Sequence, residues 1–224
     1  GQSSDKAAVM TSQADVQRRR YRALIIGGWS PGPLDAIRSR FASEIDFEEP
    51  TIPMPPAGLR WCLNPCLLLL VAYPVGVVPF LWGQALNMTD SVVVVWLLRA
   101  VVVVISLFIL RLLVAGVVWF AIRDGIRVVQ RCIRFWGPDL VIGFSWGGHL
   151  ATLLIHERKW AGPVVLLAPV VRVMSCWSCT PRPKLQQIST SAPVHVFHAD
   201  GDPFCPDSQV QDFSSAGFEV HRFH

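Results

Sequence analysis

Two long apolar stretches in the middle of the chain constrain its structure more than any other feature. Residues 61–89 contain no charged side chain, and residues 91–122 contain only Arg99 and Arg111. A helix of about 20 residues crosses the hydrocarbon core of a bilayer, so each stretch is long enough to span it. The rest of the chain is too short to surround both stretches as the buried core of a soluble protein. We therefore expect an integral membrane protein with two spans.

The charges around these stretches predict how they are arranged. Only the few residues around 87–90 separate the stretches, which favours a tight helical hairpin that returns the chain to the side it came from. This turn has no basic residue, whereas Arg60 precedes the hairpin and Arg123 and Arg127 follow it. The positive-inside rule then places the remainder on a cytoplasmic, stromal or matrix-like side, and an organelle membrane stays open. The predicted division is a polar N-terminal segment, a first soluble part, the hairpin and a second soluble part: residues 1–21, 22–60, 61–122 and 123–224.

One charge lies well inside the second stretch. Arg111 has apolar residues on both sides for several turns. An unpaired guanidinium at such a depth is costly. We expect Arg111 to make an intramembrane polar contact with a carboxylate, with backbone carbonyls, or with a polar group of a lipid or cofactor.

Outside the hairpin, short apolar runs alternate with helical patterns. Leu34, Ile37 and Phe41 have the spacing of an amphipathic helix. The second apolar stretch keeps helical spacing beyond its end, which predicts one helix up to the stop at Gly137 and Pro138. The strand-like runs are residues 22–27, 139–145, 163–170, 193–199 and 218–224. This alternation predicts the α/β class, a mostly parallel sheet with helices on both faces, interrupted by the transmembrane helical hairpin.

Residues 140–154 contain the pattern that carries chemistry. A strand-like run is followed by Gly143, Ser145 and Gly147 as G-x-S-x-G, and then by a helical pattern. A chain that turns this sharply from strand to helix needs glycines beside the serine, which is itself held in a strained, exposed conformation. The helix N-terminus offers free N–H groups that stabilise negative charge on a substrate oxygen. The pattern therefore predicts a nucleophile elbow.

These residues resemble the α/β-hydrolase family, and the resemblance covers most of residues 22–224 apart from the hairpin. It includes the strand with its oxyanion turn, the elbow, the strand after the elbow and the acid loop: residues 23–29, 142–148, 165–170 and 196–206. The family's first two strands have no counterpart, so the resemblance implies a trimmed core. It also implies that Ser145 is the nucleophile and that the backbone N–H groups of Trp29 and Trp146 form the oxyanion hole.

The resemblance assigns the acid and the base to the last part of the chain. Asp202 is the expected acid, because it fits the spacing of the acid loop better than Asp200 does. His224 is the expected base, since it lies nearer the loop than His221, although the family places this histidine several residues beyond the last strand. His221 and His224 are three apart and would face opposite sides of a strand. Without a base, a serine is a poor nucleophile at neutral pH.

Other polar residues have ordinary interpretations. His149 and His156 are expected to make surface or capping contacts on the elbow helix, and Cys176 and Cys179 form one C-x-x-C without the second pair that a zinc site needs. The net charge of +4 is small and scattered, which excludes a nucleic-acid surface. No metal and no cofactor is expected.

Two functions remain open. One is a membrane-anchored serine hydrolase that acts on an ester, thioester or lipid-like substrate through an acyl-enzyme, with membrane lipids around its hairpin. The alternative is a catalytically degenerate hydrolase-fold accessory subunit of a larger membrane complex, respiratory or photosynthetic, whose other subunits pack on the hairpin. The position of His224, the absence of a partner for Arg111 inside the hairpin and the small residues Ala100, Ala115 and Gly116 favour the alternative.

Overall fold

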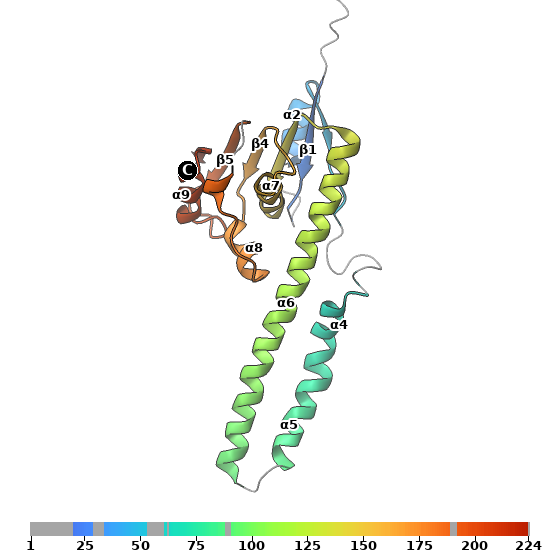
Figure 1. Cartoon of the computed structure of the whole chain (residues 1–224), viewed down its shortest axis with the longest axis vertical. Coiled ribbons are helices and arrows are strands. Elements are labelled where there is room, and N and C mark those ends of the chain that lie inside the picture. Colours follow the sequence, from blue (N-terminus) through green and yellow to red (C-terminus); the bar gives the residue numbers. More distant parts are fainter. Residues whose placement is uncertain are drawn as a thin grey trace, which may run out of the picture.

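A six-stranded sheet forms the head of the molecule, and a helical hairpin projects from it (Figure 1). This computed structural model describes residues 20–28, 34–52, 61, 63–87, 91–188 and 192–223. All strands are parallel and lie in the order β2-β1-β3-β4-β5-β6. They are β1 Tyr21–Ile26, β2 Ile45–Glu48, β3 Leu140–Phe144, β4 Val164–Leu167, β5 Val194–Ala199 and β6 Glu219–Phe223.

Helices cover both faces of this sheet, which confirms the predicted fold class. The helices of the head are α2 Leu34–Phe41, α7 Trp146–His156, α8 Val171–Trp177, the 3-10 turn η2 Leu185–Gln187 and α9 Asp207–Ser215, together with the end of α6 Val92–Trp136. Successive strand residues point to opposite faces. Leu24 and Ile26 share a core with α6, α7 and α8, whereas Ala23 and Ile25 pack against α2.

The first arm of the hairpin has three helical segments, α4 Pro65–Ala72, the π-helical η1 Tyr73–Val77 and α5 Val78–Asn87. The π-helical segment lies at Pro74, which has no N–H to donate. Asn64 caps the start of α4 by accepting hydrogen bonds from the N–H groups of Cys66 and Leu67. The arm packs along α6, where the Tyr73 hydroxyl lies 3.3 Å from Oγ of Ser106.

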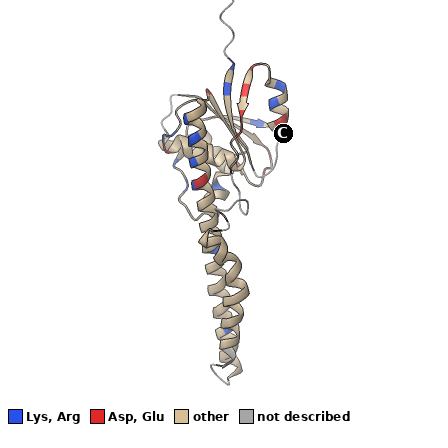
Figure 2. Cartoon of the chain, turned by 90° about the vertical axis from the view of Figure 1, so that its right-hand side faces the viewer, with Lys and Arg blue, Asp and Glu red and all other residues tan. Residues whose placement is uncertain are grey.

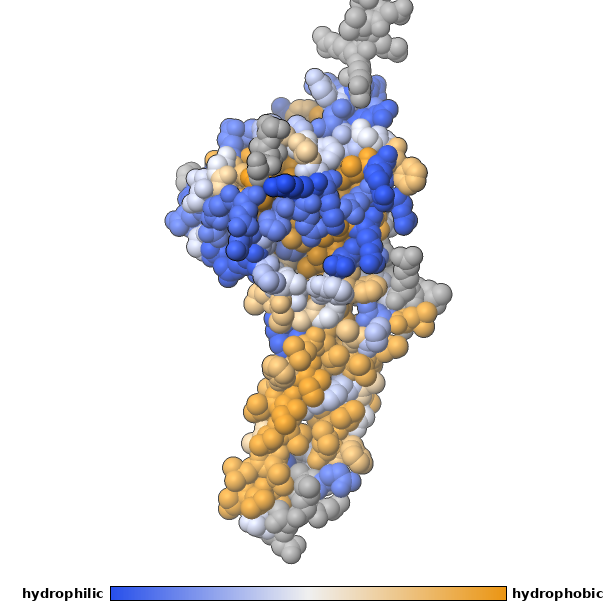
Figure 3. All heavy atoms as spheres, in the orientation of Figure 1, coloured by the Kyte–Doolittle hydropathy of each residue, from blue (hydrophilic) through white to orange (hydrophobic). Residues whose placement is uncertain are grey.

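Helix α6 is continuous over 45 residues and links the hairpin to the head. It ends at Gly137, whose φ of 61° is in the left-handed region that favours glycine, and this confirms the predicted stop. The boundary predicted between residues 122 and 123 therefore falls inside one helix. Two helical stretches, Pro65–Gln84 and Val92–Trp136, are long and apolar enough to cross a membrane. Charged residues gather on the head (Figure 2), and the surface of the hairpin is hydrophobic (Figure 3).

The strand order creates a switch point between β1 and β3. The chain runs from β1 to β2 on one side and returns through the hairpin to β3 on the other side. In open parallel sheets, ligands bind outside the carboxyl ends of the strands at such a point. These ends lie on the side of the head from which the hairpin projects (Figure 1).

Candidate active site

Ser145 lies between β3 and α7 in a backbone conformation that few residues adopt. Its φ is 53° and its ψ is −113°, a combination that is strained for a residue with a Cβ. Its N–H donates to the carbonyl oxygen of Leu167 at 2.8 Å, and its own carbonyl accepts from the N–H groups of His149 and Val170 at 3.2 and 3.3 Å. These bonds hold the serine in the kind of turn that a nucleophile elbow requires.

Three glycines make room for this turn. A Cβ at Gly147 would lie 1.9 Å from the carbonyl oxygen of Ile26, and a Cβ at Gly143 would lie 2.7 Å from that of Gly147. A Cβ at Gly148 would lie 2.9 Å from the Cβ of Pro169. All three distances are shorter than van der Waals contact, so α7 approaches the ends of its neighbouring strands this closely only because these positions have no side chain.

The start of α7 supplies a donor beside the serine. Trp146 is the first residue of α7, so its N–H has no acceptor inside the helix, and the helix end carries a partial positive charge. The loop after β1 also begins next to the serine, because a Cβ at Gly28 would lie 3.1 Å from Cβ of Ser145. Trp29, the predicted second donor, lies outside the described residues.

An apolar cavity of about 160 Å³ is located at Ser145. Its walls come from the start of α7, from α8 and from the loop after β5: Trp146, Val170, Val173, Met174, Trp177 and Phe204. None of these side chains carries a formal charge. The cavity therefore suits an apolar group, such as an acyl chain, better than a charged one.

Arg111 connects the hairpin to the wall of this cavity. Its guanidinium donates to the backbone carbonyl of Trp177 at 2.9 Å and to that of Cys176, both at the C-terminal end of α8. The last carbonyls of a helix have no partner within it and carry partial negative charge, so a guanidinium there is stabilising. Backbone carbonyls are one of the partner types expected for Arg111. They belong to the head and not to the hairpin.

The loop after β5 reaches the same cavity. Oδ1 of Asp202 accepts hydrogen bonds from the N–H groups of Phe204 at 2.9 Å and Cys205 at 3.4 Å, and Phe204 lines the cavity. The side chain of Cys205, the residue after Phe204, is fully buried. Burial, reinforced by the charge of Asp202, raises the pKa of the Cys205 thiol to about 11, so this cysteine stays protonated and is a poor nucleophile.

His195 of β5 and His221 of β6 contact each other on the sheet face opposite α7. Nδ1 of His195 lies 3.3 Å from Nε2 of His221 and 3.2 Å from Oε2 of Glu219. Phe197 stacks on the ring of His221 with 4.6 Å between ring centres. The two histidines and Glu219 are close enough together to hold a metal ion.

No histidine ring in the described part of the chain has a hydrogen bond to Ser145 or to the carboxylate of Asp202. His224, the predicted base, lies outside the described residues. Asp200, the rival acid, belongs with His198 and Asp207 to a second group of potential metal ligands.

His149 is buried, contrary to the expected surface or capping role. Its side chain is 1% exposed, and neither ring nitrogen has a hydrogen-bond partner among the described residues. Burial lowers its pKa to about 4, so the ring is neutral at pH 7. The sequence held a signal for this burial, because His149 lies one helical turn before Leu153 on a helix that packs between the sheet and α6. Cys176 and Cys179, in contrast, are exposed free thiols.

Comparison with known proteins adds little to this geometry. No protein-family model and no curated protein sequence matches the chain. A crystal structure described as a dienelactone hydrolase from Klebsiella pneumoniae is similar over 91% of this chain and 73% of the other chain. The TM-score is 0.45 and the sequence identity is 13%. A likeness this weak says nothing about chemistry.

Proposed function

We propose that this protein is a membrane-anchored serine hydrolase that acts on an ester or thioester with an apolar, lipid-like acyl group. One observation carries the proposal: Ser145 is held in a strained turn at the floor of an apolar cavity. Strain of this kind costs about 1–3 kcal/mol and persists only where the surrounding structure enforces it. The close glycine contacts around Ser145 provide that enforcement.

In the proposed mechanism, Ser145 Oγ attacks the carbonyl carbon of the substrate. The N–H of Trp146, with that of Trp29, stabilises the negative charge that develops on the substrate oxygen. The proton of Ser145 passes through His224, oriented by Asp202, to the departing alcohol or thiol, which leaves an acyl-enzyme. Water then attacks the acyl carbon by the same route, releases the acid and restores the Ser145 hydroxyl.

The junction of hairpin and head supports the lipid-like substrate class. About 30 Å of helix separates Val92 from Arg111, which is the thickness of the hydrocarbon layer. Arg111 holds the end of α8, and α8 forms a wall of the Ser145 cavity. Trp177 is 43% exposed at this end of α8, and an amphipathic tryptophan is typical of the membrane interface. In this arrangement the cavity lies at the level where acyl esters of the bilayer lie.

The proposal includes the side of the membrane on which the head lies. Arginines follow the apolar part of α6, and the positive-inside rule places the head on a cytoplasmic, stromal or matrix-like side. A protease-protection assay on sealed vesicles checks this placement, because the head must then be cleaved only from that side.

Turnover of p-nitrophenyl esters by the detergent-solubilised full chain tests the chemistry. We expect hydrolysis that rises from acetate to octanoate esters, because the cavity is apolar. Ser145→Ala must abolish it while the protein stays folded, and Ser39→Ala, which removes an exposed hydroxyl on α2, must leave it unchanged. Equal rates of ester hydrolysis in the wild type and in Ser145→Ala would contradict the proposal.

The contacts of the histidines on β5 and β6 favour a second, non-enzymatic function. Within the described residues, His195 and His221 contact each other and Glu219, and His198 lies 3.7 Å from Asp207, so none of these rings is bonded to Ser145. The lack of a described histidine at Ser145 supports a degenerate hydrolase fold that serves as an accessory subunit of a respiratory or photosynthetic membrane complex, with partner helices on the apolar hairpin. Of the small residues expected to allow such contacts, Gly116 is occupied inside the hairpin, since a Cβ there would lie 2.7 Å from Sγ of Cys66. Co-purification in a stoichiometric complex would favour this function, and a monodisperse monomer would count against it.

A further inference from the structure

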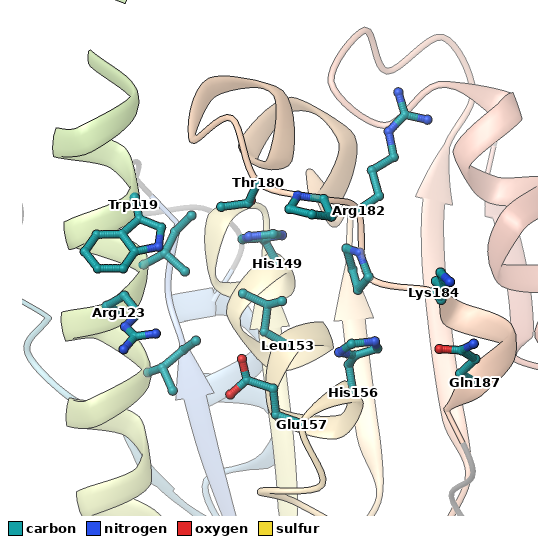
Figure 4. A pocket seen from close by; sticks show the side chains of 14 residues that line it. Trp119, Arg123, His149, Leu153, His156, Glu157, Thr180, Arg182, Lys184 and Gln187 are labelled. Carbon is teal, nitrogen blue, oxygen red and sulfur yellow. The ribbon is translucent and has the colours of Figure 1, made fainter. Parts of the chain in front are cut away.

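A second, larger cavity lies between the hairpin helix and the head. Its volume is about 390 Å³, and α6, α7 and the segment 180–187 enclose it (Figure 4). It shares no lining residue with the Ser145 cavity. It is therefore a separate site, and the proposed hydrolase chemistry assigns it no role.

The wall of this cavity on the α6 side is apolar and lies where the apolar stretch of that helix ends. Ile122 and Ile126 of α6 and Leu153 of α7 line it there. Trp119 lies at the edge nearest the hairpin, and the guanidinium of Arg123 lies 4.9 Å from the centre of its ring (Figure 4). Both residues lie beyond Arg111 along α6, so this edge of the cavity is the part of the cavity that faces the bilayer surface in the arrangement proposed above.

The opposite side of the cavity is basic. Arg182 and Lys184 line it from the segment 180–187, and both are exposed. Within the described part of the chain, neither has an ion-pair or hydrogen-bond partner. The one acidic residue of the lining, Glu157, is paired with Lys159, which does not line the cavity. Three cations thus line the cavity, Arg123 at its α6 edge and Arg182 and Lys184 on the opposite side, and Glu157 is the acidic residue of the lining.

His149 forms part of the lining between the apolar and basic sides. It is 1% exposed, and both of its ring nitrogens lack a partner among the described residues. A neutral imidazole offers one N–H donor and one nitrogen acceptor. Buried polar groups of this kind are nearly always satisfied, so the unpaired ring points to a missing polar ligand.

We infer that this cavity binds an amphiphile with a phosphate ester, namely an anionic phospholipid whose phosphate binds on the basic side, at Arg182 and Lys184. Guanidinium and ammonium groups recognise phosphate oxygens by charge-assisted hydrogen bonds. The apolar wall takes the glycerol and the start of the acyl chains, and His149 hydrogen-bonds the polar headgroup. Basic pockets next to membrane helices recognise lipid headgroups by the same chemistry.

The lipid as the source of the phosphate rests on the proposed membrane anchoring, whereas the recognition of phosphate does not. A free phosphate ester from solution would present the same oxygens to the same cations. Ser145 has no part in this site, so failure of the hydrolase proposal leaves it intact, and the two failures are measured separately.

The test is native mass spectrometry of the full chain in neutral detergent, titrated with dioleoyl phosphatidylglycerol. We expect one tightly held lipid per chain, and at least about tenfold weaker binding in Arg182→Gln/Lys184→Gln. The matched control is Arg127→Gln/Arg131→Gln, which removes the same charge from exposed positions of α6 outside the cavity and must bind as the wild type does. Equal weakening in both variants would overturn the site, because binding would then follow net charge alone. Unchanged binding in both variants would overturn it as well.

The second arm distinguishes the two sources of phosphate. Dioleoyl phosphatidylcholine and inorganic phosphate are titrated under the same conditions. Weak binding of both supports an anionic lipid. Inorganic phosphate that binds as tightly as the anionic lipid, and loses this binding in Arg182→Gln/Lys184→Gln, supports the phosphate site but overturns the lipid as its ligand. Thermal unfolding of each variant in the same detergent verifies that all of them are folded.

Discussion

Strands β3 and β6 belong to the same sheet, yet the polar side chains that follow or lie on them are held in different ways. At β3, backbone bonds to β4 and close glycine contacts to β1 fix Ser145 in one strained conformation. At β6, the side chains of His221 and Glu219 contact each other and His195 on the opposite, more open face of the sheet. The position of the nucleophile is therefore determined by backbone packing, whereas the position of the base depends on a single side chain. Substitutions near Ser145 should have large effects and substitutions on β6 small ones.

The largest effect is expected at Gly147. Gly147→Ala places a Cβ 1.9 Å from the carbonyl oxygen of Ile26, so α7 must move away from β1. We expect a loss of more than about 3 kcal/mol in the free energy of unfolding. Gly83→Ala is the matched control, since a Cβ there meets nothing within 4 Å. Thermal unfolding in detergent compares the two, and equal melting temperatures would mean that the elbow is not tightly packed.

Acid should lower the free energy of unfolding, because His149 on α7 is buried in its neutral form. Its pKa in the folded protein is about 4, below the ordinary value of 6.5, so between these values the unfolded chain binds a proton that the folded protein does not. Stability is then complete above pH 6.5 and falls as the pH falls toward 4, by at most about 3 kcal/mol. Melting temperatures measured from pH 7 to pH 4.5 should show this fall in the wild type and in His156→Gln. His149→Gln should lack most of it, and an unchanged slope in that variant would show that another group titrates.

Arg111 should contribute less, because its contacts involve two carbonyls at one helix end. Arg111→Met keeps an unbranched apolar stem but removes the donors to Trp177 and Cys176. We expect a loss of about 1–2 kcal/mol in stability and faster hydrogen exchange in α8, with β5 and β6 unchanged. Exchange that is uniform across the head would contradict the link between Arg111 and the wall of the cavity.

Replacing the strained serine should stabilise the protein slightly. Ser145→Gly relieves a φ of 53° that costs a side-chain-bearing residue about 1 kcal/mol or more, and we expect a gain of about 1 kcal/mol. Ser145→Ala keeps the Cβ and should show no such gain. A loss of stability in Ser145→Gly would mean that the serine side chain stabilises the turn.

The smallest effect is expected on β6. His221→Ala removes a ring that is partly exposed and contacts only the neighbouring side chains of the open face. We expect a change within about 0.5 kcal/mol in stability and no change in the reactivity of Ser145. A large loss of reactivity would show that His221, and not His224, serves as the base.

Local patterns in the sequence predicted most of the fold. The strands follow from short apolar runs, and the stop of α6 follows from Gly137. Contacts between distant segments were beyond that reasoning. The carbonyl partners of Arg111, for example, lie 65 and 66 residues further along the chain.

In the candidate site, too, local features could be predicted from the sequence and contacts between distant segments could not. The motif around Ser145 predicts a local turn, because its glycines and serine lie within a few residues of each other. The base depends on the tertiary position of a histidine, which spacing alone does not determine. The three cations of the second cavity come from α6 and from the segment 180–187, so no local pattern connects them.

The central claim is that Ser145 is an activated nucleophile. Labelling of the detergent-solubilised full chain with a fluorophosphonate probe, followed by peptide mass spectrometry, tests it most directly. The account predicts a single adduct on Ser145 that disappears in Ser145→Ala and persists in His221→Ala. A folded wild-type protein that acquires no adduct at Ser145 would contradict the claim and leave the elbow as the remnant of a hydrolase in an accessory subunit.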